Sequence, residues 1–385
     1  MNICTLNSIA KVGTSRFAKD FTLTEKMDDA VGVLVRSGVM HDMDLPKSLL
    51  AIARAGAGTN NVPCDKCAEE GIVVFNTPGA NANGVKELTL AGLIMSSRNV
   101  VPATQWVKTL AGEGENVPKL VEKGKGQFVG PEILGKKLGV IGLGAIGVMV
   151  ANDATNLGMQ VYGYDPFISV DAAWNLKRGV KHCLSLAELY ENCDYITIHV
   201  PCTKDTKGMI NKEAIDQMVD GVRILNFARG ELVDTQSILD GVASKKVACY
   251  VTDFPNEQML NVENVIAIPH LGASTPESED NCAIMAVDQL QDYLLNGNIK
   301  NSVNMPNADM ARSGDSRICI FHKNVPGIIS NITGVIAQAN LNISNMTDKS
   351  RGEMAYTILD VEGTPDNAVI EKLSATQGVG RIRVL

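Results

Sequence analysis

The chain has 385 residues, of which 45% are hydrophobic and 20% charged, a composition typical of a globular protein with room for two or three domains. Its formal net charge of −8 argues against nucleic acid or an anionic membrane surface as the main partner. The sequence does not open with a basic stretch followed by an apolar one, and no run approaches the ~20 apolar residues of a membrane-spanning helix, so we expect a cytoplasmic protein.

Over the first 90 residues, short apolar runs alternate with helical patterns. The expected strands are 31–35, 50–53 and 72–75, and the expected helices are 45–49 and 63–70. This alternation predicts a small parallel sheet. Arg36, Arg54 and the run 76–79 follow its strands. Because ligands bind beyond the carboxyl ends of the strands in such sheets, these three loops form one candidate ligand surface.

The next segment carries a glycine-rich motif in a full structural context. A helix is expected over 83–95 and a Gly- and Lys-rich loop over 112–130. The apolar run 138–141 then leads into a G-x-G-x-x-G sequence, a helical pattern, a second strand at 160–164 and an acidic residue at its end. The motif consists of Gly142, Gly144, Gly147 and Asp165.

Each part of this motif has a task in binding a dinucleotide. The first glycine permits a tight turn, the second lets the backbone approach a pyrophosphate, and the third lets the helix pack close to the sheet. Free N–H groups at the helix start hold the anion, and Asp165 can accept hydrogen bonds from both hydroxyls of a ribose. A tight turn without a ligand would leave this acid unexplained. The pattern predicts a βαβ unit that binds NAD rather than NADP.

The second half of this domain places one reactive residue after each of three strands. Further strands are expected at 195–200, 223–227, 248–252 and 265–268. Arg229, Glu257 and His270 follow the last three of them. The helix expected at 277–295 returns the chain to the first domain, which is therefore discontinuous, with a crevice between the two domains.

These three residue types suit the oxidation of a 2-hydroxy acid. A guanidinium binds a carboxylate and a carbonyl oxygen together, and an imidazole exchanges a proton near neutral pH. A carboxylate beside the imidazole holds it in one tautomer and stabilises its charged form. Taken singly, each residue has an ordinary alternative: a surface cation, a solvated acid or a core histidine. Their shared sheet edge favours catalysis.

A third, smaller module follows an expected linker at 306–314. Residues 317–321, 328–338, 343–349, 355–361, 366–374 and 382–384 alternate strand, helix, strand, strand, helix, strand. This is the ferredoxin-like order. The module carries no acid–base cluster, and we interpret it as regulatory. An assembly role is the alternative.

The chain resembles the D-isomer-specific 2-hydroxyacid dehydrogenases over residues 1 to about 305. The resemblance lies in RAGAGTNNV at 54–62, NTPGANAN at 76–83, the glycine motif, NFARGELVD at 226–234 and PHLGAST at 269–275. Within that family the combination is most similar to the branch that oxidises D-3-phosphoglycerate. Residues 316–385 resemble the ACT domain that such enzymes carry.

The resemblance implies roles for individual positions. The implied catalytic set is Arg229, Glu257 and His270. The implied cofactor-binding positions are Gly142, Gly144, Ala145, Ile146, Gly147, Asp165, Pro201, Thr206, Phe227, Ala228, Asp253 and Gly272. Arg54, Ala80 and Asn81 would bind the substrate, with Arg36 as a further candidate from its place in the sheet. His322, Asn324 and Asn342 match positions that bind L-serine in feedback-inhibited relatives.

The sequence also departs from the family pattern. Ala145 and Ile146 stand where an arginine usually lies, so a side-chain contact to the pyrophosphate is missing. The D-V-F-x-x-E motif of the family reads T-D-F-P-N-E here, which leaves open whether Thr252 or Asp253 meets the nicotinamide. No metal site is expected.

We expect an α/β fold with two Rossmann-like parallel-sheet domains and an ACT domain. The expected domains are 1–92 with 286–305 for substrate, 93–285 for NAD, and 315–385 for regulation. The resemblance implies at least a dimer, with a homotetramer as the alternative. A glyoxylate or hydroxypyruvate reductase is a second candidate enzyme, and an NAD-sensing binding protein is a candidate of another class.

Overall fold

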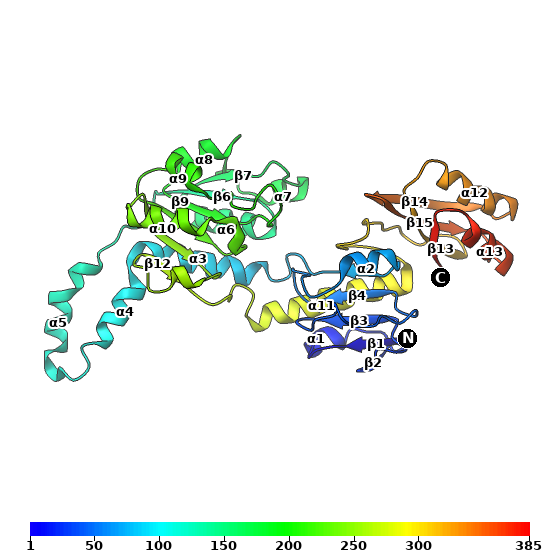
Figure 1. Cartoon of the computed structure of the whole chain (residues 1–385), viewed down its shortest axis with the longest axis horizontal. Coiled ribbons are helices and arrows are strands. Elements are labelled where there is room, and N and C mark those ends of the chain that lie inside the picture. The colour runs from blue at the N-terminus through cyan, green and yellow to red at the C-terminus, as the bar shows by residue number, and fades with distance from the viewer. The chain divides into compact units, whose positions relative to one another are not determined.

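The computed structural model describes residues 1–385. They divide into two compact units, one made of residues 1–81 and 279–385 and the other of residues 82–278. None of the helices has both the length and the apolar character that a membrane crossing needs. Figure 1 shows the course of the chain and the labels of its elements.

The first unit begins with a five-stranded parallel sheet in the order β2-β1-β3-β4-β5. Its strands are β1 (Asn2–Thr5), β2 (Thr22–Thr24), β3 (Gly32–Val35), β4 (Ala51–Arg54) and β5 (Val73–Phe75). Its helices are α1 (Lys11–Thr14), α2 (Cys64–Glu69) and most of α11 (Pro276–Asn296). The three predicted strands are confirmed. β1 and β2 were not expected, because β1 (NICT) has only two apolar residues between an asparagine and a threonine, and two of the three residues of β2 are exposed.

The helix expected at 45–49 is wrong. The chain there makes a single turn, closed by the N–H of Leu49 donating to the carbonyl of Pro46 at 2.9 Å. Pro46 has no N–H, and its ring disfavours helical backbone in the residue before it. The spacing of four residues between Leu45 and Leu49 suggested a helix, but Pro46 prevents one from forming there.

A four-stranded antiparallel sheet in the order β14-β15-β13-β16 completes the first unit. Its elements are β13 (Ser316–Lys323), α12 (Ile328–Gln338), β14 (Ile343–Arg351), β15 (Met354–Val361), α13 (Asn367–Ala375) and β16 (Val379–Val384). The expected ferredoxin-like order is confirmed. The chain thus has an ACT-like C-terminal module.

Both faces of the ACT-like sheet are covered. Ile318 and Ile320 of β13 belong to a core shared with α12 and α13, whereas Cys319 and Phe321 belong to the core of the parallel sheet and α11. Arg383 also donates to the carbonyls of Tyr293 and Leu294, in the last turn of α11, at 3.1 and 2.8 Å. The module is therefore packed onto the parallel sheet and α11 of its unit.

The second unit is built on a seven-stranded parallel sheet in the order β12-β11-β10-β9-β6-β7-β8. Its strands are β6 (Lys137–Ile141), β7 (Gln160–Tyr164), β8 (Lys181–His182), β9 (Tyr195–Ile198), β10 (Val222–Asn226), β11 (Val247–Thr252) and β12 (Val265–Ala267). Its main helices are α3 (Ala82–Arg98), α6 (Ala145–Asn156), α7 (Val170–Asn175), α8 (Leu186–Asn192), α9 (Lys212–Gln217) and α10 (Thr235–Ala243).

The strand order reverses at β6, between β7 and β9. This is the arrangement of a doubly wound Rossmann sheet, in which the ligand crevice opens at the carboxyl ends of the strands beside the reversal. The glycine motif directly follows β6. The expected Rossmann-like fold is confirmed.

A helical arm stands where the sequence suggested a loop over 112–130. It consists of α4 (Val100–Lys108), η1 (Gly114–Asn116), α5 (Val117–Gly124) and η2 (Lys125–Phe128). Apolar residues three to four apart in VPKLVEKG give α5 its helical period despite the lysines and glycines around it. None of the four helices buries a residue within the chain. In Figure 1 the arm, in cyan, projects from the rest of its unit.

Candidate active site

The glycine motif has the geometry that a pyrophosphate site requires. Gly142 has φ +90°, and a Cβ there would lie 2.7 Å from the carbonyl oxygen of His199. A Cβ on Gly147 would overlap the carbonyl of Gly142, whereas one on Gly144 would meet nothing within 4 Å. The turn and the helix contact therefore need glycine, and the space before α6 is open.

The start of α6 offers free backbone donors. Its N-cap is Gly144, no side chain caps the helix, and it runs for 12 residues. Uncapped N–H groups and the positive end of the helix dipole favour an anion at this place. The backbone alone must supply these contacts, because Ala145 and Ile146 have no polar side chains.

Asp165 is held in place by the backbone and keeps acceptor capacity. Oδ2 accepts the N–H of Leu143 at 2.8 Å, and Oδ1 accepts the N–H of Phe167 at 2.9 Å. A carboxylate has about four lone-pair sites, so it can accept further hydrogen bonds from a partly exposed position. The side chain suits the hydroxyls of a ribose.

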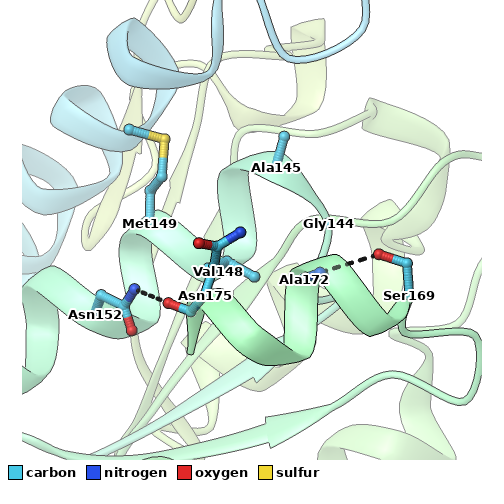
Figure 2. Close-up of a pocket in the computed structure, with 8 residues that line it drawn as sticks. All are labelled: Gly144, Ala145, Val148, Met149, Asn152, Ser169, Ala172 and Asn175. Atoms are coloured by element: carbon cyan, nitrogen blue, oxygen red, sulfur yellow. Dashed lines mark hydrogen bonds between the residues drawn. The ribbon is translucent and has the colours of Figure 1, made fainter. Parts of the chain in front are cut away.

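A cavity of about 470 Å³ lies between α6 and α7 and reaches the glycine motif. Figure 2 shows Val148, Met149 and Asn152 of α6 opposite Asn175 of α7. Asn152 donates to the carbonyl of Asn175 at 2.8 Å, which fixes the distance between the two helices. Ala145 borders this cavity with only a methyl group.

The loop after β10 presents Arg229. The buried side chain of Asn226 donates to the carbonyl of Arg229 at 2.8 Å and accepts the N–H of Ala228 at 3.2 Å. Arg229 is exposed, and its guanidinium donates to the carbonyl of Ala228 at 2.6 Å. Phe227, in contrast, is a core residue: it is 5% exposed and its ring packs against Gly92.

His270 lies beside a buried carboxyl group in the same unit. Its ring centroid is 4.6 Å from that of Phe254. Asp253 is 1% exposed; its Oδ2 accepts the N–H of Gly272 at 3.3 Å, and its Oδ1 has no partner. Burial raises the pKa of Asp253, against the positive charges of His270 and Arg229, which lower it.

The sequence left Thr252 and Asp253 as alternatives for the nicotinamide contact. The hydroxyl of Thr252 accepts the N–H of Phe254 at 3.1 Å, and the residue is fully buried. Asp253 has the unpartnered oxygen. A buried acceptor without a donor is costly to leave unpaired, so Asp253 is the better fit of the two.

The expected pair of Glu257 and His270 is not hydrogen-bonded in this structure. Both residues are exposed, and Glu257 begins η4 (Glu257–Met259). Catalytic hydrogen bonds are often longer without bound substrate. The pairing of these two residues stays a prediction.

The remaining cofactor-binding candidates lie in two loops of the second unit. Thr206 donates to the carbonyl of Pro201 at 2.6 Å, which closes the loop after β9. Gly272 follows His270 and directs its N–H to Asp253. A Cβ on Gly272 would lie 3.2 Å from the side chain of Val85.

Arg54 is the last residue of β4, and Arg36 directly follows the neighbouring strand β3. Nε of Arg54 donates to the carbonyl of Arg36 at 3.1 Å, and Arg36 forms an ion pair with Glu279 at 2.5 Å. Ala80 and Asn81 lie in the loop that leads to α3. Sequence reasoning missed Asn7, whose side chain holds the Arg36 loop. Its only signal was an asparagine close to a weak strand.

The three candidate effector residues differ in their surroundings. His322 is 1% exposed: Nδ1 meets the carbonyl of Lys323 at 2.9 Å, and Nε2 meets Asp348 and Thr357 at 3.0 and 2.8 Å. Asn324 is exposed and donates to the carbonyl of Gly352 at 3.2 Å, and Asn342 is also exposed. Both ring nitrogens of His322 thus have partners inside the module.

Comparison with known proteins identifies the family. Residues 90–272 match the family described as D-isomer specific 2-hydroxyacid dehydrogenase, NAD binding domain. D-3-phosphoglycerate dehydrogenase of Escherichia coli K12 is 31% identical over 95% of this chain and 89% of that enzyme. The enzyme of the same name from Methanocaldococcus jannaschii is 34% identical over 80% of this chain, which spans 58% of its length.

A solved structure agrees with this result. NAD⁺-bound 3-phosphoglycerate dehydrogenase of Entamoeba histolytica superposes with a TM-score of 0.61 and 29% identity, covering 79% of this chain and 98% of that one. Residues 90–272 form an NAD-binding domain, and the cofactor is NAD. The chain belongs to the D-isomer-specific 2-hydroxyacid dehydrogenases, a family of NAD-dependent oxidoreductases.

Proposed function

We propose that the chain oxidises D-3-phosphoglycerate to 3-phosphohydroxypyruvate, the entry step to serine. The likeness to D-3-phosphoglycerate dehydrogenase of E. coli supports this, because it extends over 95% of this chain and includes the C-terminal module. A hydroxy-acid dehydrogenase without such a module would match only the two larger domains.

The residues present fit NAD. The uncapped start of α6 and the open space at Gly144 suit a pyrophosphate, and Asp165 suits a ribose. The unpartnered Oδ1 of Asp253 suits the NH₂ group of a carboxamide. When bound, NAD accepts a hydride from the substrate carbon.

We assign the proton chemistry to His270 and the carboxylate of the substrate to Arg229. His270 would take the proton of the substrate hydroxyl at a ring nitrogen, and Arg229 would hold the carboxylate and the developing carbonyl oxygen through two N–H groups. We assign Glu257 to hold the imidazole in the accepting tautomer. Ala80 and Asn81 would add backbone contacts to the carboxylate.

The phosphate group is assigned to the arginines of the first unit. Arg54 ends β4 and Arg36 follows the adjacent parallel strand β3, and the side chain of Arg54 donates a hydrogen bond to the carbonyl of Arg36. A phosphate dianion binds well to guanidinium groups that offer several donors in one plane. Arg36 would have to share its charge between the phosphate and Glu279.

The test is NADH formation by the purified chain with 3-phosphoglycerate, compared with glycerate and lactate. We expect turnover with 3-phosphoglycerate, and we expect Arg54→Ala to raise its KM far more than that of an unphosphorylated 2-hydroxy acid. Glyoxylate and hydroxypyruvate, assayed with NADH, are the controls for a reductase. Preference for either of them, with no turnover of 3-phosphoglycerate, would overturn the proposal.

We further propose that the helical arm pairs two copies of the chain. Its helices bury no residue in the single chain. Val107 of α4 is 47% exposed, and Val129, which directly follows η2, is 79% exposed. Apolar side chains on an arm without a core need a partner surface. Light scattering should give at least a dimer, and Val107→Asp with Val129→Asp should shift it toward the monomer. An unchanged mass would refute the arm as the interface.

The ACT-like module is proposed to bind L-serine as an effector. The support is the resemblance of its H-x-N-x-P-G sequence and the exposure of Asn324 and Asn342.

A further inference from the structure

Asn7 organises the loop after β3 through one side-chain oxygen. It lies two residues beyond the end of β1, and its Oδ1 accepts three successive backbone N–H groups. The N–H groups belong to Arg36 at 3.2 Å, Ser37 at 3.2 Å and Gly38 at 2.8 Å. A Cβ on Gly38 would lie 3.1 Å from this oxygen, so the loop closes tightly around it.

A second asparagine holds the carbonyl side of the same loop. Nδ2 of Asn61 donates to the carbonyl of Gly38 at 2.7 Å and, more weakly, to that of Arg36 at 3.4 Å. Asn61 is only 7% exposed. The loop backbone is therefore fixed from both sides, its N–H groups by Asn7 and its carbonyls by Asn61.

The network ends on the side chain of Arg54. The carbonyl of Arg36 accepts Nε of Arg54 at 3.1 Å, and β3 and β4 are neighbours with Val35 opposite Arg54. A Cβ on Gly56 would lie 2.5 Å from the first guanidinium nitrogen of Arg54, so the side chain folds closely over this glycine. The position of the Arg36 carbonyl thus sets the direction of the Arg54 guanidinium.

We propose that Asn7 is a positioning residue for Arg54. It holds the Arg36 loop so that the loop carbonyl accepts Nε and thereby sets the orientation of the guanidinium. Asn7 acts through the loop and does not itself touch the substrate. The assignment of Arg54 to the substrate phosphate rests on the proposed function, whereas the connection from Asn7 to Arg54 rests on the hydrogen bonds above.

Physical chemistry separates this role from a merely structural one. A loop that only needed closing could be held by backbone bonds, which any residue supplies. Here one acceptor serves three donors, and its loss would leave three N–H groups without a protein partner. Asn7→Leu keeps the approximate shape and removes the acceptor, whereas Asn7→Asp keeps acceptor oxygens. The two variants therefore isolate the hydrogen bonds from the side-chain volume.

The first test is amide hydrogen exchange of the loop in the full chain without ligands. We expect exchange at residues 36–38 to become about tenfold faster or more in Asn7→Leu and to stay near the wild-type rate in Asn7→Asp. Asn2→Leu is the matched control, because Asn2 is an exposed asparagine at the opposite end of β1. Unchanged protection of the amides of residues 36–38 from exchange in Asn7→Leu would show that the side chain of Asn7 does not hold this loop.

The second test is a double-mutant cycle on the KM for 3-phosphoglycerate. Asn7→Leu should raise KM about tenfold with little change in kcat, and Asn7→Asp should recover part of the loss. On the Arg54→Ala background the same change should add less than about twofold, because the side chain that Asn7 directs is gone. Equal effects on both backgrounds would show that Asn7 does not act through Arg54.

The tests distinguish failure of this inference from failure of the proposed function. If wild type does not oxidise 3-phosphoglycerate, the proposed substrate is wrong, and the cycle is run with the 2-hydroxy acid that is turned over fastest. The exchange experiment needs no substrate. If Asn7→Leu does not fold, Asn7→Ser, whose shorter hydroxyl cannot serve all three donors, takes its place in both tests and must give the same signs.

Discussion

Arg317 and Asp360 form a fully buried ion pair between adjacent strands of the ACT-like sheet. Nε lies 2.6 Å from Oδ1, and the second guanidinium nitrogen lies 2.8 Å from Oδ2. The remaining guanidinium nitrogen donates to the carbonyl of Asn296, the last residue of α11, at 2.8 Å. One arginine therefore joins the core of the C-terminal module to the end of the helix that packs on the parallel sheet.

Asp360→Asn should destabilise the first unit strongly. The change leaves the Arg317 guanidinium buried without its counter-charge, which typically costs about 3–5 kcal/mol of unfolding free energy. Urea unfolding of the full chain measures the loss. Asp309→Asn is the matched control, because its pair with Lys300 is more than half exposed and should contribute less than about 1 kcal/mol. A loss of unfolding free energy as small as that of the control would show that the buried pair of Arg317 and Asp360 contributes little to stability.

The same pair predicts how stability depends on pH. Burial alone would raise the pKa of Asp360, but hydrogen bonds from Arg317 and Ser313 outweigh it and the net pKa is lowered from 3.8. A carboxyl whose pKa is lower in the folded state contributes stability above its unfolded pKa and loses it as pH falls through the folded value. The stability difference between wild type and Asp360→Asn should therefore shrink below about pH 4. If this stability difference instead grew as the pH fell, the pKa of Asp360 would have to be raised in the folded state, which would contradict the prediction.

The sequence predicts the sheets well because their strands are nearly continuous apolar runs. β6 and the glycine motif could be assigned together, since Gly142 and Gly147 have no sterically acceptable replacement in a strand–turn–helix of this shape. The ACT-like order followed from alternating elements of ordinary length. The local sequence pattern was sufficient to predict an element wherever the residues of that element alone determine its conformation.

Local pattern was insufficient where distant groups decide it. Asn7 has its role only because β1 lies beside β3, and β1 has just two apolar residues between Asn2 and Thr5, which give no clear strand pattern. His322 matched a ligand-binding motif, yet Asp348 and Thr357 from two other strands enclose its ring. The segment 112–130 contains α5, which has a helical period but buries no residue in the single chain, and its composition alone suggested a loop.

NAD should be preferred strongly over NADP. With Asp165 assigned to the ribose, its carboxylate would face the 2′-phosphate of NADP, and Pro166 and Phe167 follow it without a compensating cation. Two like charges about 4 Å apart in a partly desolvated site repel by several kcal/mol. The ratio of kcat/KM for the two cofactors tests this, with Asp165→Asn as the variant that removes the charge but keeps an acceptor. Equal efficiency with both cofactors in wild type would contradict this role.

His270→Gln should lower turnover by about 10²–10⁴-fold, the usual contribution of a positioned general acid–base. NADH affinity should change little, because the substitution leaves the glycine motif and Asp165 intact. Glu257→Gln should reduce turnover less and move the pH–rate profile to lower pH, since it removes a charge that favours imidazolium. Steady-state kinetics across pH measures both variants.

Asp253→Asn is the variant to compare with Glu257→Gln, because either carboxylate could hold the imidazole of His270. Asn keeps one oxygen and replaces the other with an NH₂ group, so the position that accepts the N–H of Gly272 and the position assigned to the carboxamide no longer both present an acceptor. We expect weaker NAD binding, measured by fluorescence titration, with the pH–rate profile kept. A shifted profile in Asp253→Asn, with none in Glu257→Gln, would transfer the role of holding the imidazole from Glu257 to Asp253.

Serine binding to the ACT-like module should depend on Asn324. Its side chain is exposed, whereas the buried His322 ring already has partners at both nitrogens, so the two positions should respond differently. Asn324→Ala should weaken calorimetric serine binding at least about tenfold and leave the melting temperature unchanged, because only a partly solvated bond to Gly352 is lost. His322→Ala should lower the melting temperature, since Asp348 and Thr357 lose a buried partner, and any loss of serine binding there would follow from that damage. If serine lowers the affinity for NADH or substrate, each of these must lower the affinity for serine by the same factor.

No heat of serine binding to the wild type, or undiminished binding by Asn324→Ala, would leave the module with the assembly role alone.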